Sequence, residues 1–167
     1  MNVREIEKLG QRLVSLAKDY SGGPEREMRL DPALYAFLLC TGRKVDRQWH
    51  ANLPGYDRSP RIDFRIGGSN PVLLEFAVRR PSGGSSLYGS QNQSELRKLA
   101  RFGKSSAKLR ALLLVDLSPW PIEKAKLRAT YDKVHCGRGR FKRSPVKVIY
   151  TCSDSAYSFK WDPYKTA

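Results

Sequence analysis

Hydrophobic and polar residues alternate most clearly between residues 61 and 80. Every second residue of RIDFRI, 61–66, is apolar, and the apolar run VLLEFAVRR, 72–80, follows after the short GGSNP connection. Alternation with a period of two is typical of β-strands, and a tight glycine-containing connection between two such runs predicts a β-hairpin. Two acidic residues, Asp63 and Glu75, stand inside these predicted strands. A carboxylate at such a position needs a chemical reason.

Helical patterns come before the hairpin. Apolar residues spaced by three and four predict an amphipathic helix over 3–19. Asp31 and Pro32 predict the N-cap and the first residue of a second helix. A turn-rich segment with one short strand around 45–51 then leads to the hairpin. We expect the two helices to cover one face of a sheet.

Strand and helix patterns alternate after the hairpin. A helix is predicted over 91–102, another helix starts near Pro121, and strands are predicted at 146–152 and 157–161. Between the helices, ALLLVDLS at 111–118 is an unbroken aliphatic run, which is typical of a strand covered on both faces. This order predicts an α/β fold with a central mixed β-sheet flanked by helices.

Length and charge narrow the possible functions. The 167 residues fit a single domain, 1–167, with a core at about 31–118 and a basic C-terminal part at 119–167. Lysine and arginine number 31 against 16 acidic residues, which gives a net charge of +15 and an attraction for polyanions. We therefore expect a nucleic-acid partner, DNA rather than RNA. An acidic protein or a membrane surface is the alternative explanation of the charge.

Several other classes are disfavoured. No apolar run is long enough to span a membrane, and the charged N-terminus lacks the apolar region of a signal peptide, so a cytoplasmic location is expected. The three cysteines form no C-x-x-C pair, which argues against a zinc site. No Walker phosphate-binding motif occurs, which argues against an ATPase.

The two carboxylates lie opposite each other in the predicted hairpin. Asp63 can face Glu75 across the turn, on the strand face that also carries Ala77 and Arg79. Two like charges this close are unfavourable unless a cation or a basic side chain, such as Arg65 or Arg79, lies between them. The pair predicts either a divalent metal site or a structural ion-pair cluster.

The order of features along this part of the chain is an acid in one apolar strand, a turn, a second apolar strand with a central glutamate, a polar loop and a helix that opens with glutamine. This order resembles the core of the PD-(D/E)XK nuclease superfamily. The resemblance implies a restriction-endonuclease-like fold and Mg²⁺, with Mn²⁺ as a substitute, held by Asp63 and Glu75. It also implies metal-dependent hydrolysis of phosphodiester bonds in DNA. Gln91 or Gln93 would be the assisting polar residue on the helix.

The chain departs from the family pattern at one position. The family's lysine would stand two residues after Glu75, where this chain has Ala77. Arg79 on the same strand, or Arg97 and Lys98 on the following helix, are the candidates to replace it. An enzyme is favoured. The alternative is a nuclease fold that has lost catalysis and binds DNA or RNA, and a third hypothesis is a subunit of an RNA-containing assembly.

A basic segment near the C-terminus is the main predicted nucleic-acid surface. Together with Arg97 and Lys98, the expected contacts are Arg138, Arg140, Phe141, Lys142 and Arg143. The three tryptophans, Trp49, Trp120 and Trp161, are expected to be core or lid residues rather than platforms for bases. A homodimer would let one site per chain act on both strands of a duplex.

Overall fold

The computed structural model describes residues 1–19, 27–51, 53, 59–82, 87–103, 106–135 and 143–164. In these ranges the chain forms one α/β domain with a six-stranded mixed sheet, as the sequence predicts. The helices are α1 (Val3–Asp19), α2 (Glu27–Leu39), α3 (Gln93–Ala100) and α4 (Lys124–Asp132). The strands are β1 (Val45–His50), β2 (Arg61–Ile66), β3 (Val72–Arg79), β4 (Leu109–Asp116), β5 (Val146–Thr151) and β6 (Ala156–Trp161).

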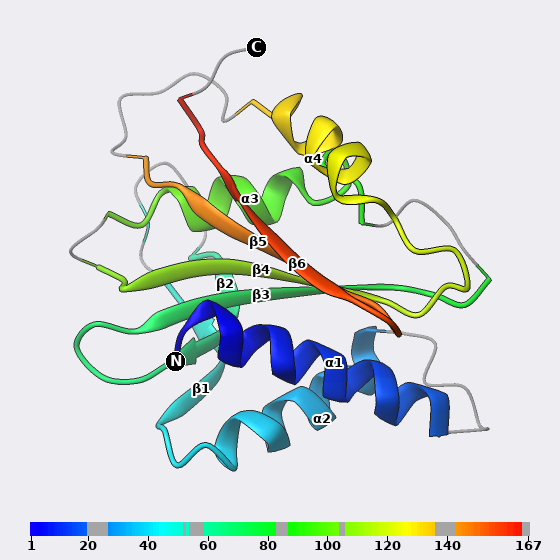
Figure 1. Ribbon diagram of the computed structural model, residues 1–167. Coiled ribbons are helices and arrows are strands. Elements are labelled where there is room, and N and C mark those ends of the chain that lie inside the picture. Colours follow the sequence, from blue (N-terminus) through cyan, green and yellow to red (C-terminus); the bar gives the residue numbers. More distant parts are fainter. Residues whose placement is uncertain are drawn as a thin grey trace.

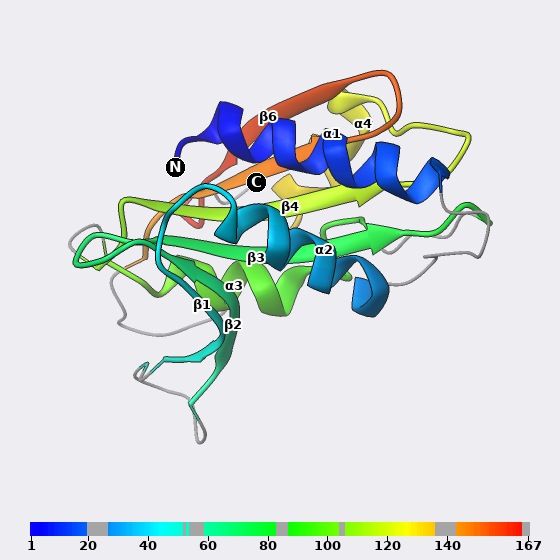
Figure 2. The ribbon, with the colours of Figure 1, turned by 90° about the horizontal axis from the view of Figure 1, so that it is seen from below.

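The strands lie in the sheet in the order in which they occur in the sequence, β1 to β6. The β2–β3 hairpin is antiparallel, as are the pairs at both ends of the sheet, whereas β4 is parallel to both β3 and β5. Helices α1 and α2 cover one face, and α3 and α4 cover the other (Figures 1 and 2). The parallel strands are therefore shielded from water on both sides.

Two hydrophobic cores, one on each face, fix which way each residue of β3 points. Leu74, Phe76 and Val78 pack with the leucines and isoleucines of α1 and α2. Leu73 and Ala77 pack on the opposite face, where the apolar residues of α3 and α4 cover them. Because side chains alternate along a strand, Glu75 must project on the α3 side.

The predicted start of α2 is wrong. The helix begins at Glu27, and Pro32 lies inside it rather than at its first position. Leu30, Leu34 and Leu38 are all buried at helical spacing, so the apolar stripe includes Leu30, one turn before Leu34, and holds the longer helix against the sheet. Asp31 forms an ion pair with Arg47 of β1 instead of capping the helix.

The other helices differ from prediction mainly at their starts. α3 begins at Gln93, and α4 begins at Lys124 rather than near Pro121. Residues before α4 stay extended because Ile122 donates its backbone N–H to the Tyr150 hydroxyl at 2.8 Å and accepts from the Tyr157 hydroxyl at 2.6 Å. In the described part of the chain no helix is both long and apolar enough to cross a membrane.

A close approach at Gly89 positions the segment that leads into α3. Gly89 donates its N–H to the Thr130 hydroxyl of α4 at 3.1 Å. A Cβ atom at this position would lie 2.4 Å from the Thr130 carbonyl oxygen and 2.7 Å from a methyl group of Val134. Only glycine lets the two segments pack this closely.

We expect Gly89→Ala to lower the free energy of unfolding by about 1–3 kcal/mol, because the added methyl group overlaps a backbone carbonyl that cannot move alone. Urea denaturation measures the change. Gly68→Ala is the matched control, since a Cβ at Gly68 meets nothing within 4 Å. Equal stability of the two variants would contradict this account of the packing.

Candidate functional site

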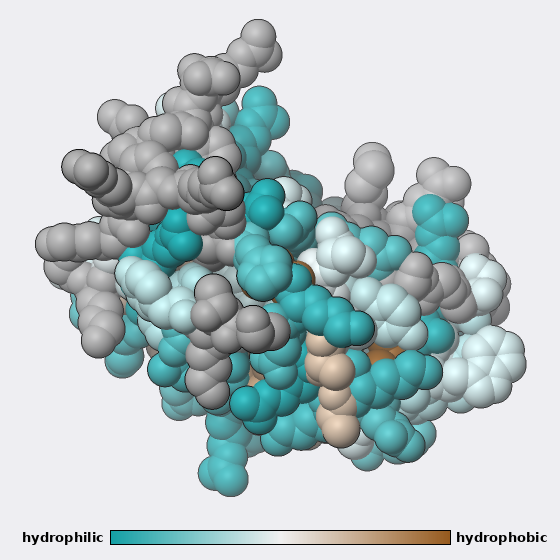
Figure 3. Space-filling view, turned by 90° about the horizontal axis from the view of Figure 1, so that it is seen from above, coloured by the Kyte–Doolittle hydropathy of each residue, from teal (hydrophilic) through white to brown (hydrophobic). Residues whose placement is uncertain are grey.

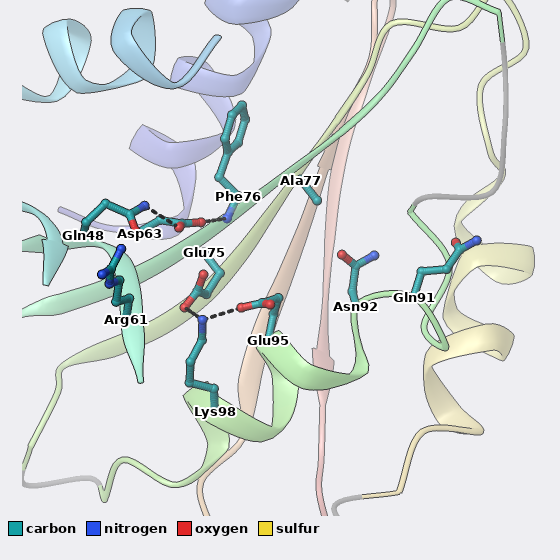
Figure 4. A pocket seen from close by; sticks show the side chains of 10 residues that line it. All are labelled: Gln48, Arg61, Asp63, Glu75, Phe76, Ala77, Gln91, Asn92, Glu95 and Lys98. Carbon is teal, nitrogen blue, oxygen red and sulfur yellow. Dashed lines mark hydrogen bonds and ion pairs between the residues drawn. The ribbon is translucent and has the colours of Figure 1, made fainter. Parts of the chain in front are cut away.

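The candidate site is a pocket of about 320 Å³ between the β2–β3 hairpin and α3 (Figure 4). It lies on the α3 face of the sheet, at the level where Glu75 projects from β3. The lining residues are Gln48, Arg61, Asp63, Glu75, Phe76, Ala77, Gln91, Asn92, Glu95 and Lys98. The strands contribute Asp63 and Glu75, and the helix contributes Glu95 and Lys98, so acidic and basic groups from four chain positions converge here.

Asp63 is fixed in orientation by two hydrogen bonds. Its Oδ2 accepts from the backbone N–H of Phe76 at 3.0 Å, across the hairpin. Its Oδ1 accepts from the side-chain amide of Gln48 at 3.0 Å. These two hydrogen bonds keep the carboxylate from turning out to solvent. Asp63 faces Glu75 across the hairpin, as the predicted register requires.

Gln48 is a functional candidate that the sequence did not indicate. It has φ of 50°, and no other described non-glycine residue has a positive φ. The flanking residues Arg47 and Trp49 keep their register with β2, so the distortion is confined to Gln48. A left-handed conformation costs a non-glycine residue about 1 kcal/mol, and here it accompanies a hydrogen bond to Asp63.

Lys98 places an ammonium group against Glu75. Its Nζ lies 2.7 Å from Glu75 Oε1 and 2.5 Å from Glu95 Oε2, and Figure 4 shows the three side chains pointing toward one another. Glu95 and Lys98 share a face of α3 because they are three residues apart. Glu75 is only 1% exposed, and Lys98 is 15% exposed in its side chain. The ammonium group thus comes from the helix and not from position 77 of β3.

The pKa values follow from this crowding. Burial raises the pKa of Glu75 well above its usual range, and the charge of Asp63 raises it further. Burial also raises the pKa of Asp63, although its hydrogen bond with Glu75 opposes this. Burial disfavours the charged form of Lys98, yet Glu75 and Glu95 together hold its pKa above normal. Lys98 is therefore held in its charged form, whereas the raised pKa values of Asp63 and Glu75 favour their neutral forms.

The donor set fits a divalent cation in part. Two carboxylates, Asp63 and Glu75, face each other, and Oε1 of Glu75 is buried with an ion-pair contact to Lys98 but no aligned hydrogen bond. Oxygen ligands of this kind are those that Mg²⁺ and Mn²⁺ prefer. Within the described residues, no three side chains of His, Cys, Asp or Glu form a complete metal-binding group.

Arg79 and two predicted helix residues lie outside the pocket. The Arg79 guanidinium pairs with Asp116 at 3.1 Å and does not line the pocket. Gln93 and Arg97 both donate to the backbone carbonyl of His135, at 3.4 and 2.9 Å. Gln91, the other glutamine considered, does line the pocket. Of the residues proposed to replace the family lysine, Lys98 reaches Glu75.

The predicted basic surface is described only in part. The backbone N–H of Arg143 donates to the Tyr164 hydroxyl at 2.9 Å. The positions of Arg138, Arg140, Phe141 and Lys142 lie outside the described residues. Their predicted contact with nucleic acid stays a prediction.

Arg79 belongs to a second buried cluster, beyond the pocket on the same face. Asp116 accepts from Arg79 at 3.1 Å, from the Tyr150 hydroxyl at 2.5 Å and from the Ser118 backbone N–H at 2.9 Å. Burial and the Asp116 carboxylate raise the pKa of Tyr150, so its hydroxyl remains a donor. Both oxygens of Asp116 accept hydrogen bonds within the protein, whereas Nε of Arg79 is buried without a hydrogen-bond partner.

No family model, curated protein or solved structure matches this chain at a significant level. Any functional argument therefore depends on the geometry of the pocket and on the charge of the chain.

We expect Arg79→Met to lower the free energy of unfolding by about 3 kcal/mol, because Asp116 would remain buried without its cation. Urea denaturation measures the loss. Arg80→Met, a change at the exposed neighbouring arginine, is the control and should alter stability by less than about 0.5 kcal/mol. If Arg79→Met were as stable as the unchanged protein, Arg79 would not have the structural role assigned to it.

Without divalent ions, the free energy of unfolding should depend on pH through Glu75. The folded protein binds a proton at Glu75 more tightly than the unfolded chain does, so the free energy of unfolding should fall as the pH rises above the ordinary range of glutamate. Glu75→Gln removes this titration and should reduce the slope, measured by urea denaturation in EDTA from about pH 5 to pH 8. The exposed Glu123→Gln should keep it. A slope unchanged by Glu75→Gln would show that Glu75 is not the group responsible.

Proposed function

We propose that this chain is a metal-dependent nuclease that hydrolyses phosphodiester bonds, in DNA rather than RNA, on a restriction-endonuclease-like fold. The observation that carries the proposal is the convergence of Asp63, Glu75 and Lys98 in one pocket. Two carboxylates and one ammonium group are the groups that the resemblance to PD-(D/E)XK nucleases leads us to expect. The hairpin followed by parallel strands, with the acids on the hairpin, supports the same assignment.

Asp63 and Glu75 would hold Mg²⁺ or Mn²⁺, and the backbone carbonyl of Phe76 is a further oxygen at this level of β3. The raised pKa of Glu75 supports this, because the repulsion from Asp63 that contributes to it is what a divalent cation relieves. When bound, such an ion neutralises charge on the phosphoryl group and lowers the pKa of a coordinated water. Gln48 would keep Asp63 in the orientation that presents its oxygens to the ion.

Lys98 would act as a hydrogen-bond donor to the substrate. Because its pKa is raised, it remains an ammonium group at neutral pH and cannot serve as a general base. A fixed positive charge beside Glu75 is suited to stabilise the negative charge that develops on the phosphate oxygens during in-line attack by water. Glu95, 2.5 Å from Nζ, would hold the ammonium in place.

The charge of the whole chain supports a polyanionic substrate. With a net charge of +15, the protein attracts nucleic acid over distances well beyond the pocket. A homodimer would bring two such pockets to one duplex.

A binding module without catalysis is the second candidate, and one observation favours it. Lys98 already contacts Glu75 at 2.7 Å, so the pocket can be viewed as a structural ion-pair cluster in which Ala77 marks a lost catalytic lysine. Such a protein would bind DNA or RNA through its basic surface and leave it intact.

Cleavage of a labelled panel of duplex, single-stranded and branched DNA and of RNA, in Mg²⁺, Mn²⁺ or EDTA, separates the two candidates. We expect DNA cleavage only with metal, and none by Asp63→Asn or Glu75→Gln, which should bind DNA as tightly or more tightly because a negative charge is gone. Lys98→Met should cleave at least about a hundredfold more slowly.

Lys108→Met is the matched control, since Lys108 is exposed and does not line the pocket. It should cleave at the rate of the unchanged protein. Binding of every substrate without cleavage in either metal would refute the nuclease and leave the binding module. Cleavage that persists in EDTA, or in both acid variants, would refute the assignment of this pocket.

A further inference from the structure

Trp120 is an exposed tryptophan on a rigid segment. Its exposed fraction is 66%, whereas Trp161 is 2% exposed and lies in the core. Trp49 is partly buried, with the Arg65 guanidinium 5.3 Å from its ring centroid. Of the two expected positions, core or lid, the core is therefore excluded for Trp120. An indole left in water forgoes a large burial energy, so its position calls for an explanation.

The backbone around Trp120 is held by hydrogen bonds on both sides. Its carbonyl accepts from Arg79 at 3.1 Å and from the Ser118 hydroxyl at 3.0 Å, and its N–H donates to the same hydroxyl at 3.3 Å. Pro119 and Pro121 flank it and restrict the backbone further. The side chain is thus presented to solvent from a backbone that has little freedom to fold it inward.

The buried Arg79–Asp116 pair anchors this segment to the sheet. Asp116 also accepts from Ser118, and Ile122, two residues after Trp120, is bound by Tyr150 and Tyr157. The Arg79 side chain is 12% exposed, and that of Asp116 is fully buried. Two buried charges and two tyrosines thus hold a segment whose most prominent outward group is one exposed indole.

The segment that carries Trp120 follows β4, at the end of the sheet where β3 also ends (Figure 1). Arg79, which binds its carbonyl, shares a strand face with Glu75 and lies four residues further along β3, or about 13 Å. Arg80 and, in the first turn of α4, Lys124 and Lys126 are exposed. Glu123 is also exposed, so basic residues outnumber acidic ones three to one among these positions. An exposed indole on such a segment matches a polyanion that carries flat rings.

The surrounding surface argues against a protein partner at this place. The described surface above α3 and α4 is mostly hydrophilic, with little hydrophobic area (Figure 3). Stable protein interfaces bury a contiguous and partly apolar patch, not one aromatic side chain among lysines.

We propose that Trp120 is a stacking platform for an unpaired nucleobase, so that the nucleic acid bound by this protein has a single-stranded segment where it leaves the pocket. The proposal rests on the proposed function, because it names the form of the substrate for that site. A paired base has both faces covered within a duplex, whereas an unpaired base offers its π-face to the indole.

Tryptophan fluorescence of the full chain, titrated in EDTA with oligo-dT or with a blunt duplex of equal length, tests the proposal without cleavage. Oligo-dT should quench the emission of the unchanged protein, and Trp120→Phe should abolish most of the quenching. Trp120→Ala should bind oligo-dT about tenfold more weakly, with its affinity for the duplex unchanged. Trp49→Phe, which removes a partly buried indole, should keep both the quenching and the affinity.

Equal affinity of Trp120→Ala and the unchanged protein for oligo-dT would overturn the proposal, and duplex binding and metal-dependent cleavage would still support the nuclease. If the emission changed with protein concentration but not with oligo-dT, the stacking proposal would be overturned, and a second copy of the chain would be the group that covers Trp120. If neither nucleic acid binds, the proposed function fails along with it. Because Trp120 is exposed, urea denaturation should show both Trp120 variants as stable as the unchanged protein.

Discussion

The burial of Glu75 in a sheet covered on both faces is the constraint on which the candidate site depends. Water cannot solvate this carboxylate, and the register of the hairpin brings Asp63 beside it. Groups from two other elements surround the two acids: Lys98 and Glu95 from α3, and Gln48 from a distorted position in β1. Three acids, Lys98 and the exposed Arg61 thus share one pocket. A buried site with unbalanced charge is costly to maintain, which is why perturbed pKa values mark candidate functional sites.

Asp116 is a second buried carboxylate, and it is stabilised in a different way from Glu75. Its carboxylate faces a guanidinium, a tyrosine hydroxyl and a backbone N–H, so its charge is matched and both of its oxygens accept hydrogen bonds. The result is rigidity rather than reactivity. The cluster and the pocket lie on one face of β3, where Arg79 and Glu75 are separated by a single intervening residue of the same face, Ala77. One strand thus carries a site open to ligands and the anchor for the segment that presents Trp120.

The position of the ammonium group shows why one substitution says little about a site. Ala77 removes the lysine that the family resemblance expects on β3, and from the sequence alone Arg79 on the same face is a reasonable replacement. In the folded chain Arg79 is committed to Asp116, whereas Lys98 extends from α3 to Glu75. A functional group that a site requires at one position can come from any helix or strand that passes near that position.

The α/β class, the hairpin, the strands and the pairing of Asp63 with Glu75 can be predicted from the sequence, because they depend on periodicities of two and of three to four residues within short stretches. The sequence did not determine that α2 begins a turn early, since the burial of Leu30 depends on the sheet beneath the helix. Nor did it show that Gln48 binds Asp63, that Lys98 and not Arg79 reaches Glu75, or that Trp120 is exposed. These features depend on contacts between elements far apart in the chain and on which surfaces stay uncovered when the elements pack, so they emerge only in the folded chain.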